Sequence, residues 1–318
     1  MDVSLTYGSA YSFLHINNCS SFDDVINDIE RLKQVFILFD FSKNNKIQFS
    51  NDYSDFKING VSLEDNFLEL TNDPSAAIYL LDCLEKAVGD KKSYLSTQLM
   101  ELNLRQNANN SFVYEYPFSL DVLWPSLTNK NHVYDYFDVC NFNSFNLKSG
   151  VEDAAEFVKK ATNIYEHIQF SNVFEEKLST IKNGDVLNYV NVFSHALNVL
   201  NQAFFKVSND ESRNDDDLNI ISGLSKSKAL RGRGLDCTRQ GANKPHFTFP
   251  EIDNPQSNEI VNCEYHLKID YADNGVRLNS SDYVRVYFGL KYNEKYDRKY
   301  IRLGYIGEHW PPRKSGKK

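Results

Sequence analysis

The chain has 318 residues, of which 41% are hydrophobic, 25% charged and 14% aromatic, so it is long enough for two globular domains of ordinary size. No stretch reaches the roughly 18 consecutive apolar residues of a membrane-spanning helix, and the first residues lack the basic start and apolar run of a signal peptide. Five cysteines without a Cys-x-x-Cys pair indicate reduced thiols, and together these features predict a cytoplasmic protein that does not contact a membrane.

The formal net charge of −8 is unevenly distributed. Residues 226–318 hold 18 Lys and Arg against 11 Asp and Glu, whereas residues 1–225 hold 17 against 32. The resulting charges of +7 and −15 predict either an anion-binding C-terminal region or attraction between the two parts. Four of the positive charges belong to the final PPRKSGKK, and we expect residues 313–318 to form a flexible basic tail.

Residues 1–150 are predicted to form a mixed α/β domain. One helix is expected from Phe22, where apolar residues recur at helical spacing, and a second from Asp73-Pro74 to Gly89. KIQFS, FKINGVSL, SFVYEYPFSL and VYDYFDVCNF are predicted to be strands, with a turn at Asn59-Gly60. Because the domain carries no phosphate-loop, dinucleotide-binding or hydrolase motif, we assign it a partner-binding or sensor role.

Residues 151–312 are predicted to form an α+β domain in which helices precede a small antiparallel sheet. Helices are expected over residues 151–167 and over the strongly apolar VLNYVNVFSHALNVLNQAFF, where His195 is interpreted as a satisfied core or surface histidine. The acidic run SNDESRNDDDLN, residues 208–219, lacks the spaced oxygens and glycine of a calcium-binding EF-hand loop. It is therefore predicted to be a solvated loop.

The last third begins with a cationic segment and continues as strands. LRGRGLDCTRQGANKP carries Arg231, Arg233 and Arg239 among glycines, which is typical either of contacts to a nucleic-acid backbone or of a disordered basic loop. Strands are predicted over residues 246–250, 259–271, 282–290 and 299–307.

The period of two in a strand assigns the side chains of the last three strands to two faces. The apolar face is predicted to hold Cys263, Tyr265, Leu267, Ile269, Val286, Phe288, Leu290, Ile301, Leu303 and Tyr305. The opposite face is predicted to hold Glu264, His266, Lys268, Asp270, Arg285, Tyr287, Tyr300 and Arg302.

This polar face has the groups needed to cleave RNA without a metal or cofactor. Attack of a ribose 2′-hydroxyl on the adjacent phosphate needs a base, a proton donor and cations for the charge that builds on phosphorus. His266 can serve either proton role, Lys268, Arg285 and Arg302 can bind phosphate, and Tyr287 and Tyr300 can stack on splayed bases.

Other interpretations of the same residues remain open. Many antiparallel sheets carry Lys and Arg on their wet face for solubility alone. Glu264 is better explained by a cross-strand ion pair than by orienting His266 or Arg285. Cys237, His246, Cys263 and His266 are soft metal ligands, but Cys263 and His266 are predicted to point to opposite faces and no second close pair exists. We therefore expect no metal.

The run CEYHLKI … RVYFGL … KYIRLGYIGEHW resembles the C-terminal pattern of a family of poorly characterised bacterial proteins. In that pattern E-x-HLK precedes RIYF and K-I-x-IG-x-IG-x-HL, and GLDCTRQ and FTFP resemble its upstream elements. The resemblance covers about residues 160–312, and Trp310 stands where the family has Leu.

The resemblance implies a component of anti-phage defence, since members of the family occur among defence and mobile-element genes. The hairpin with its isoleucine-glycine strand also resembles RelE/HigB-like toxins, which are small α/β ribonucleases. This likeness implies site roles for Lys268, Arg285, Arg302 and His309, with His266 as a residue of the family pattern.

Three functional hypotheses follow. The first is a RelE-like domain that binds RNA, in preference to DNA, and cleaves it without a metal, aimed by the acidic N-terminal domain. The second is a non-enzymatic subunit of a multi-protein defence complex that holds nucleic acid or a protein partner by charge. The third is a structural body whose two parts attract each other and which binds no ligand.

Overall fold

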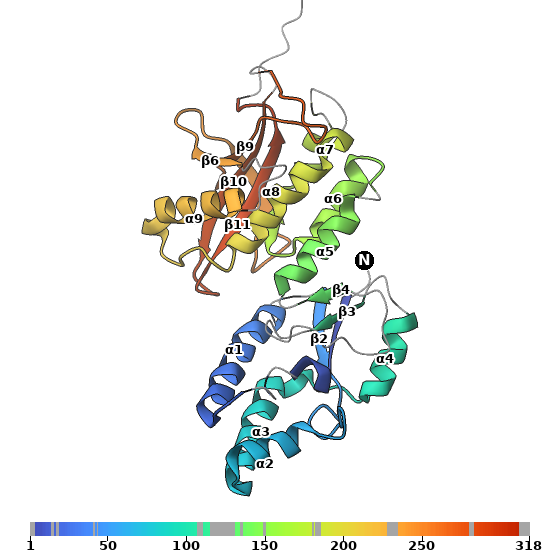
Figure 1. Cartoon of the computed structure of the whole chain (residues 1–318). Coiled ribbons are helices and arrows are strands. Elements are labelled where there is room, and N and C mark those ends of the chain that lie inside the picture. Colours follow the sequence, from blue (N-terminus) through green and yellow to red (C-terminus); the bar gives the residue numbers. More distant parts are fainter. Residues whose placement is uncertain are drawn as a thin grey trace, which may run out of the picture. The chain divides into compact units, whose positions relative to one another are not determined.

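Helix α5 (Tyr136–Lys148) contains the point at which the chain passes from one folded unit to the next (Figure 1). In this computed structural model the units are Met1–Phe142 and Asn143–Lys318, whereas the predicted boundary at residue 150 follows the helix. The structure describes residues 4–13, 16, 19–40, 42, 44–106, 111–114, 131–133, 136–148, 151–179, 181, 186–227, 235–279 and 283–311. The predicted tail lies outside the described residues. The protein is α+β, as the sequence predicts.

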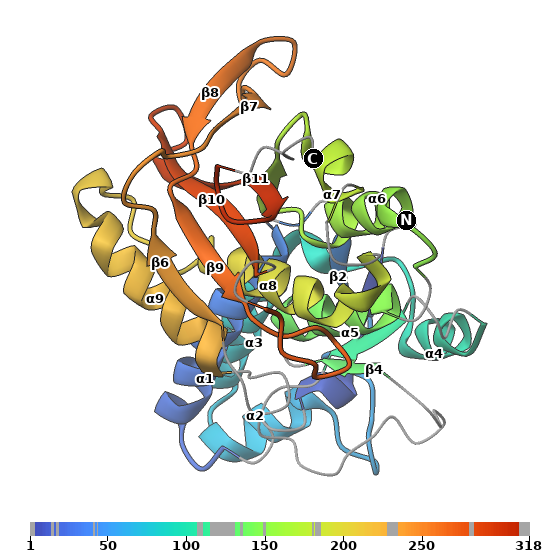
Figure 2. The same ribbon diagram turned by 90° about the horizontal axis from the view of Figure 1, so that it is seen from above.

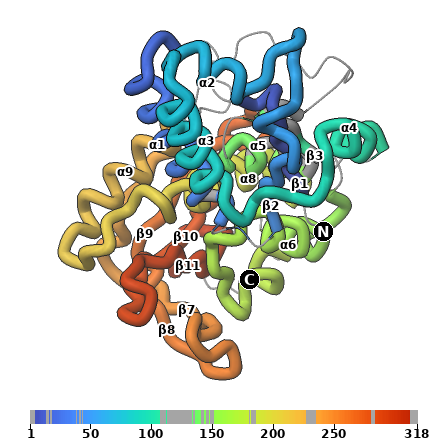
Figure 3. The backbone as a smooth tube through the Cα atoms, turned by 90° about the horizontal axis from the view of Figure 1, so that it is seen from below, coloured from blue at the N-terminus to red at the C-terminus, as the bar shows by residue number. Residues whose placement is uncertain are grey.

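The first unit is built on a parallel sheet of strands in the order β2-β1-β3-β4. Its strands and helices are β1 (Ser4–Gly8), α1 (Phe22–Asp40), β2 (Asn45–Phe49), α2 (Leu63–Thr71), α3 (Pro74–Val88), α4 (Thr97–Gln106), β3 (Ser111–Tyr114) and β4 (Asn131–Val133). Parallel neighbours need a crossover connection, and α1 makes the one from β1 to β2. Helix α3 packs against both α1 and α2 (Figure 3).

Local capping signals explain where the helices of this unit begin and end. Ser62 and Asp65 bond reciprocally to each other's backbone at the start of α2, and Asp73 accepts a bond from Ser75 N at the start of α3. Helix α3 ends at Gly89, whose φ of 55° lies in the region that favours glycine. The helices predicted from residues 22 and 74 are confirmed.

Two strand predictions in this unit are wrong. Most of VYDYFDVCNF belongs to α5, because Tyr136, Val139, Cys140 and Leu147 are buried at helical spacing. Its aromatic and β-branched residues had favoured a strand, so tertiary packing overrides that propensity. FKINGVSL forms only an isolated bridge around the predicted turn at Asn59-Gly60.

The second unit contains a sheet in the order β5-β11-β10-β9-β6 and a separate hairpin, β7–β8. Its elements are α6 (Ala154–Ile164), β5 (Ile168–Phe170), α7 (Phe174–Leu178), α8 (Val190–Ala203), α9 (Asn214–Ser227), β6 (Asp236–Arg239), β7 (His246–Pro250), β8 (Asn258–Asn262), β9 (Tyr265–Ile269), β10 (Val284–Asn293) and β11 (Arg298–Gly307). Strands β6, β9, β10 and β11 pair antiparallel, and β5 pairs parallel with β11.

The main core of this unit lies between one face of the sheet and the helices. The predicted apolar helix α8 is buried along almost its whole length and contacts β5 and β11. His195, in α8, is half-buried and bonds through Nε2 to the Ser225 carbonyl at 3.1 Å, as expected of a satisfied histidine.

The acidic run at residues 208–219 is not the solvated loop that the sequence predicts. It starts helix α9, and the Asp217 carboxylate is fully buried, where it accepts bonds from Lys299 Nζ at 2.6 Å and from Ser208 N at 2.7 Å. Asn214 also bonds to Lys299 Nζ, at 2.7 Å. This buried pair joins α9 to β11.

A bulge changes the predicted faces of the sheet. Tyr287 of β10 pairs with Tyr305 of β11, but the next residue, Phe288, pairs with Leu303, so Gly304 is the extra residue. Beyond the bulge the alternation of β11 reverses, and Tyr305 packs beside Tyr287 instead of joining Ile301 and Leu303 in the main core. The prediction for Tyr305 is therefore wrong.

The predicted long strand over residues 259–271 is broken at Cys263 and Glu264. Residues before the break form β8, which pairs with β7, and those after it form β9. Cys263 therefore packs beside Tyr287 instead of with Tyr265, and its prediction is also wrong. Figure 2 shows the β7–β8 hairpin beyond the end of the sheet, near β10 and β11.

Candidate anion-binding face

The predicted polar face of the sheet is divided by a second, smaller core. Its buried members are Phe247, Phe249, Val261, Cys263, Tyr287 and Tyr305, and Trp310 packs against them. Phe247, Phe249 and Val261 of the β7–β8 hairpin, which extends beyond the end of the sheet, thus pack over the middle of this face. Two separate groups of charged residues remain, one near β6 and β9 and one near the β10–β11 turn.

The first group is brought together by the register of three strands. Arg285 of β10 lies opposite Lys268 of β9, and Tyr287 lies opposite His266. On the other side of β9, Thr238 of β6 pairs with His266. Because directly paired residues share a face, these side chains point to the same side of the sheet. We call His266, Lys268, Arg285 and His309 the basic cluster.

His266 is the buried titratable member of the basic cluster. Its Nε2 lies 2.9 Å from Thr238 Oγ1, and its ring centroid lies 5.0 Å from that of Tyr287. The Nδ1 atom is buried and has no hydrogen-bond partner among the described residues. Burial, followed by the charges of Arg285, Lys268 and His309, lowers the pKa of His266 to about 3, so the ring is neutral at pH 7.

Arg285 is buried beside it and is only partly satisfied. Its Nη1 donates to the Asp270 carboxylate at 3.3 Å and to the Val284 carbonyl at 3.0 Å. Its guanidinium carbon lies 5.1 Å from the Tyr283 ring centroid. The Nε–H is buried and, within the described ranges, has no acceptor.

The other two members of the basic cluster are accessible. Lys268 is half-buried, and His309 is exposed with its ring centroid 6.4 Å from that of His266. The cluster therefore has an open side with two side chains that a ligand can reach and a buried side with two unsatisfied nitrogens.

The predicted arginine contacts lie elsewhere or are already paired. Arg239 is exposed but donates to Glu264 at 2.8 Å and lies 3.7 Å from Asp215. Burial favours the neutral form of Glu264, but its bonds to Arg239 and Lys244 outweigh that effect and lower its pKa. Because its carboxylate pairs with these two cations, Glu264 orients neither His266 nor Arg285. Arg231 and Arg233 lie outside the described residues.

The predicted aromatic contacts are occupied by the protein itself. Tyr287 is fully buried, and its hydroxyl accepts a bond from Trp310 N at 2.9 Å. Tyr300 is half-buried against Phe204 and Tyr296, at centroid distances of 5.6 and 6.4 Å. Tyr287 therefore offers no open face for stacking on a base, and Tyr300 already contacts two aromatic rings of the protein.

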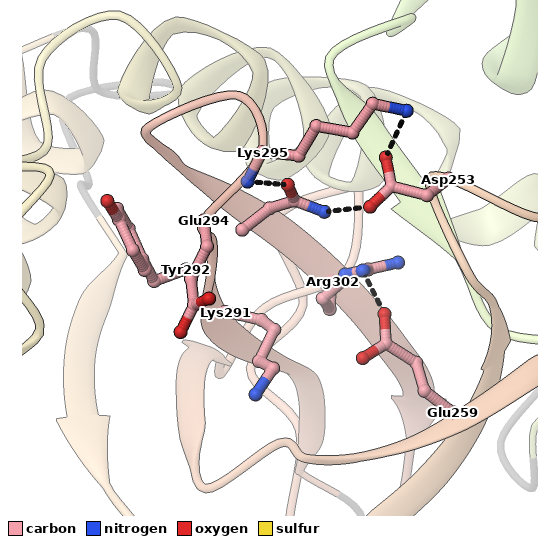
Figure 4. A pocket seen from close by; sticks show the side chains of 8 residues that line it. Asp253, Glu259, Lys291, Tyr292, Glu294, Lys295 and Arg302 are labelled. Atoms are coloured by element: carbon pink, nitrogen blue, oxygen red, sulfur yellow. Dashed lines mark hydrogen bonds and ion pairs between the residues drawn. The ribbon is translucent and has the colours of Figure 1, made fainter.

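Arg302 does not join the basic cluster. It is 1% exposed, pairs with Glu259, donates to the Pro250 carbonyl at 3.3 Å and lies over Phe249. It belongs to the second group of charges, which lines a separate hollow near the β10–β11 turn (Figure 4).

The basic cluster is better suited to holding an anion than to moving protons. A histidine with a pKa near 3 carries no proton to donate at pH 7 and is a weak base, whereas general acid–base catalysis is most efficient when the pKa lies near the working pH. An anion beside His266 would offset the positive charges of the neighbouring residues and accept a hydrogen bond from the Nε–H of Arg285.

The soft ligands considered for zinc are not grouped together in the described part of the chain. Within the described ranges no three His, Cys, Asp or Glu side chains are grouped as a metal would require. Burial raises the pKa of the Cys237 thiol to about 12 and also raises that of Cys263, which disfavours the thiolates that zinc binds.

Compared with known proteins, the chain matches no family model, no curated sequence and no solved structure. None of the helices in the described part of the chain combines the length and apolar character needed to span a bilayer.

Thr238 is the member of this site that sequence reasoning missed. It lies in GLDCTRQ, which was interpreted as part of a flexible cationic segment and not as a strand. Alternation of Cys237 and Thr238 was the available signal, but a strand of four residues is too short to establish it.

Proposed function

We propose that the second unit binds the phosphate backbone of nucleic acid, RNA in preference to DNA, at the basic cluster, as a non-enzymatic subunit of a bacterial defence complex. The defence context and the RNA preference rest on the family resemblance and are part of the proposal. A RelE-like ancestry for this unit remains a hypothesis at the level of fold analogy.

One observation carries the proposal. His266 Nδ1 and Arg285 Nε are both buried without a partner among the described residues, on one side of one sheet, with Lys268 and His309 at the open side. A buried polar atom without a partner costs roughly 1–3 kcal/mol. A phosphate oxygen at this position would accept the Arg285 Nε–H and be close to the Lys268 ammonium, which recovers part of that cost.

Binding without cleavage is favoured over the ribonuclease hypothesis for two reasons. The pKa of His266, about 3, makes it a poor general acid or base. Arg302, which the ribonuclease hypothesis needs for charge stabilisation, is paired with Glu259 in the separate hollow.

The test is the affinity of the full chain for a fluorescent single-stranded RNA across a range of salt concentrations. Removing one cation that neutralises a phosphate lowers the slope of log affinity against log salt by roughly 0.7 for a single strand. We expect Lys268→Ala to lower the affinity several-fold and to reduce the slope by about that amount. His309→Gln should lower the affinity with little change in slope.

Lys160→Ala is the matched control, since it removes the same charge from a partly exposed helix pair in the same unit. If Lys160→Ala weakens RNA binding as much as Lys268→Ala, binding is diffuse and the basic cluster is not the site. The same samples are run on a denaturing gel. RNA cleavage that His266→Gln abolishes would restore the ribonuclease hypothesis.

A further inference from the structure

The hollow between the two hairpins of the second unit is a separate feature from the basic cluster. It is open to solvent and has a volume of about 560 Å³, within the range of small-molecule sites of roughly 300–1,000 Å³. Its walls come from the β7–β8 hairpin and from the end of β10, the following turn and β11. The lining residues are Asp253, Glu259, Lys291, Tyr292, Asn293, Glu294, Lys295 and Arg302.

One end of the hollow is closed by neutralised charges. Asp253 accepts a bond from Asn293 Nδ2 at 3.3 Å and lies 3.4 Å from Lys295 Nζ (Figure 4). Asp253 and Lys295 therefore offset each other, and they hold the tips of the two hairpins together.

The other end holds two cations that are not equally satisfied. Arg302 is 1% exposed, and its buried Nε–H has no acceptor within the described ranges. In the same described part of the chain no ion pair or hydrogen bond involves the exposed Lys291 ammonium. Arg302 lies opposite Gly289, two residues before Lys291 on β10, so both cations stand on the same face of the sheet.

Glu259 occupies the position that an anionic ligand would take. Its carboxylate pairs with Arg302 Nη2, and its side chain remains 23% exposed, so the pair borders solvent. Figure 4 shows Glu259, Arg302 and Lys291 around the same space. A ligand with a carboxylate would gain little binding free energy by displacing the Glu259 carboxylate from Arg302, because the two groups have the same charge and the same acceptor oxygens.

We propose that this hollow binds a phosphate monoester with a polar organic part, such as a sugar phosphate. A phosphate monoester carries a charge of about −1.5 to −2 at pH 7 and three acceptor oxygens, so it can bind Arg302 and Lys291 together where Glu259 binds only one of them. The lining is mainly polar, which suits a sugar and not an apolar group. The site is independent of the proposed RNA binding at the basic cluster.

The test is calorimetric titration of the full chain with ribose 5-phosphate, with ribose and matched ionic strength as controls. We expect saturable binding of the phosphate ester only. Lys291→Ala, an exposed change that leaves the fold intact, should weaken it about tenfold, as expected for one charge-assisted bond. Glu259→Gln should tighten it several-fold, because the competitor of the ligand is weakened.

Glu294→Gln is the matched control, since it removes the same charge from the same hollow without touching Arg302. If Glu259→Gln and Glu294→Gln tighten binding equally, displacement of Glu259 is wrong. If ribose 5-phosphate does not bind, or binds Lys291→Ala as it binds wild type, the site is overturned.

A second arm separates the two sources of a phosphate monoester, a free sugar phosphate and the 5′ end of a nucleic acid. The affinities of 5′-phosphorylated and 5′-hydroxyl RNA of the same sequence are compared. A gain from the 5′-phosphate that Lys291→Ala removes identifies the end of an RNA, whereas equal affinities identify the free ester. Binding of the 5′-hydroxyl RNA reports the basic cluster alone, so failure of either proposal is visible separately.

Discussion

Lys299 and Asp217 are both fully buried, and their ion pair is among the most consequential side-chain contacts in the second unit. Breaking a buried pair by removing one partner leaves an uncompensated charge and typically costs about 3–5 kcal/mol. We expect Lys299→Ala or Asp217→Asn to lower the free energy of unfolding by about that much in urea denaturation.

Two comparisons check this explanation. Lys160→Ala breaks a partly exposed surface pair with Glu156 and should cost less than about 1 kcal/mol. The double variant Lys299→Met, Asp217→Leu should recover much of the lost stability, since it leaves no unpaired buried charge. If it is as unstable as the single variants, packing and not charge explains the loss.

His266 links stability to pH. Its pKa is about 3 in the folded state and near 6.5 in an unfolded chain, so the unfolded state binds the extra proton between these values. The contribution of His266 to the free energy of unfolding is therefore present above pH 6.5 and is lost as the pH falls toward 3. The free energy of unfolding falls by up to about 1.4 kcal/mol for each pH unit in this range. Urea denaturation should show that the free energy of unfolding falls less between pH 7 and pH 5 for His266→Gln than for wild type. His309→Gln, at an exposed ring, should behave as wild type.

At the scale of elements, helix α8 begins without a local cap. Tyr189, at the N-cap position, makes no capping bond with its side chain. Asp273 supplies the acceptors instead, taking bonds from Asn191 N at 2.7 Å and Val192 N at 3.0 Å. Asp273→Ala should destabilise the unit by about 0.5–2 kcal/mol, as expected for a lost cap. Asp273→Asn should lower the stability less than Asp273→Ala does, because the asparagine side chain keeps one acceptor oxygen. Equal loss in both variants, measured by thermal unfolding, would contradict a capping role.

The sequence predicts elements well where their signals are local. Asp73-Pro74 and Gly89 delimit α3, and the apolar period of α8 predicts its burial. The cap of α8 could not be predicted in this way, because Asp273 lies about eighty residues away in the sequence.

The sheet shows the opposite case, in which a single residue changes the faces of a strand. Period-two alternation correctly places His266, Lys268 and Arg285 together. It fails for Tyr305, because a bulge at Gly304 reverses the alternation. Phe247 of another hairpin lies so close to Gly304 that a side chain at this position would collide with it. The burial of Arg302 has the same origin, since β7 and β8 supply Phe249 and Glu259.

At the scale of the whole molecule, the two units differ in charge. Residues 1–142 hold 10 Lys and Arg against 20 Asp and Glu, a net of −10, whereas residues 143–318 hold 25 against 23, a net of +2. A polyanion is therefore repelled by the first unit as a whole, and the RNA binding proposed at the basic cluster of the second unit acts against this repulsion. The first unit should weaken RNA binding or restrict it to partners that neutralise its charge.

Removal of the first unit tests this electrostatic role. A fragment of residues 136–318, which keeps α5 whole, should bind RNA more tightly than the full chain at low salt. The difference should shrink as salt rises, because the screening length falls from about 30 Å at 0.01 M to about 10 Å at 0.1 M. A cooperative thermal transition would establish that the fragment is folded. If the folded fragment binds RNA more weakly at every salt concentration, the first unit contributes contacts of its own, and its negative charge is not what governs binding.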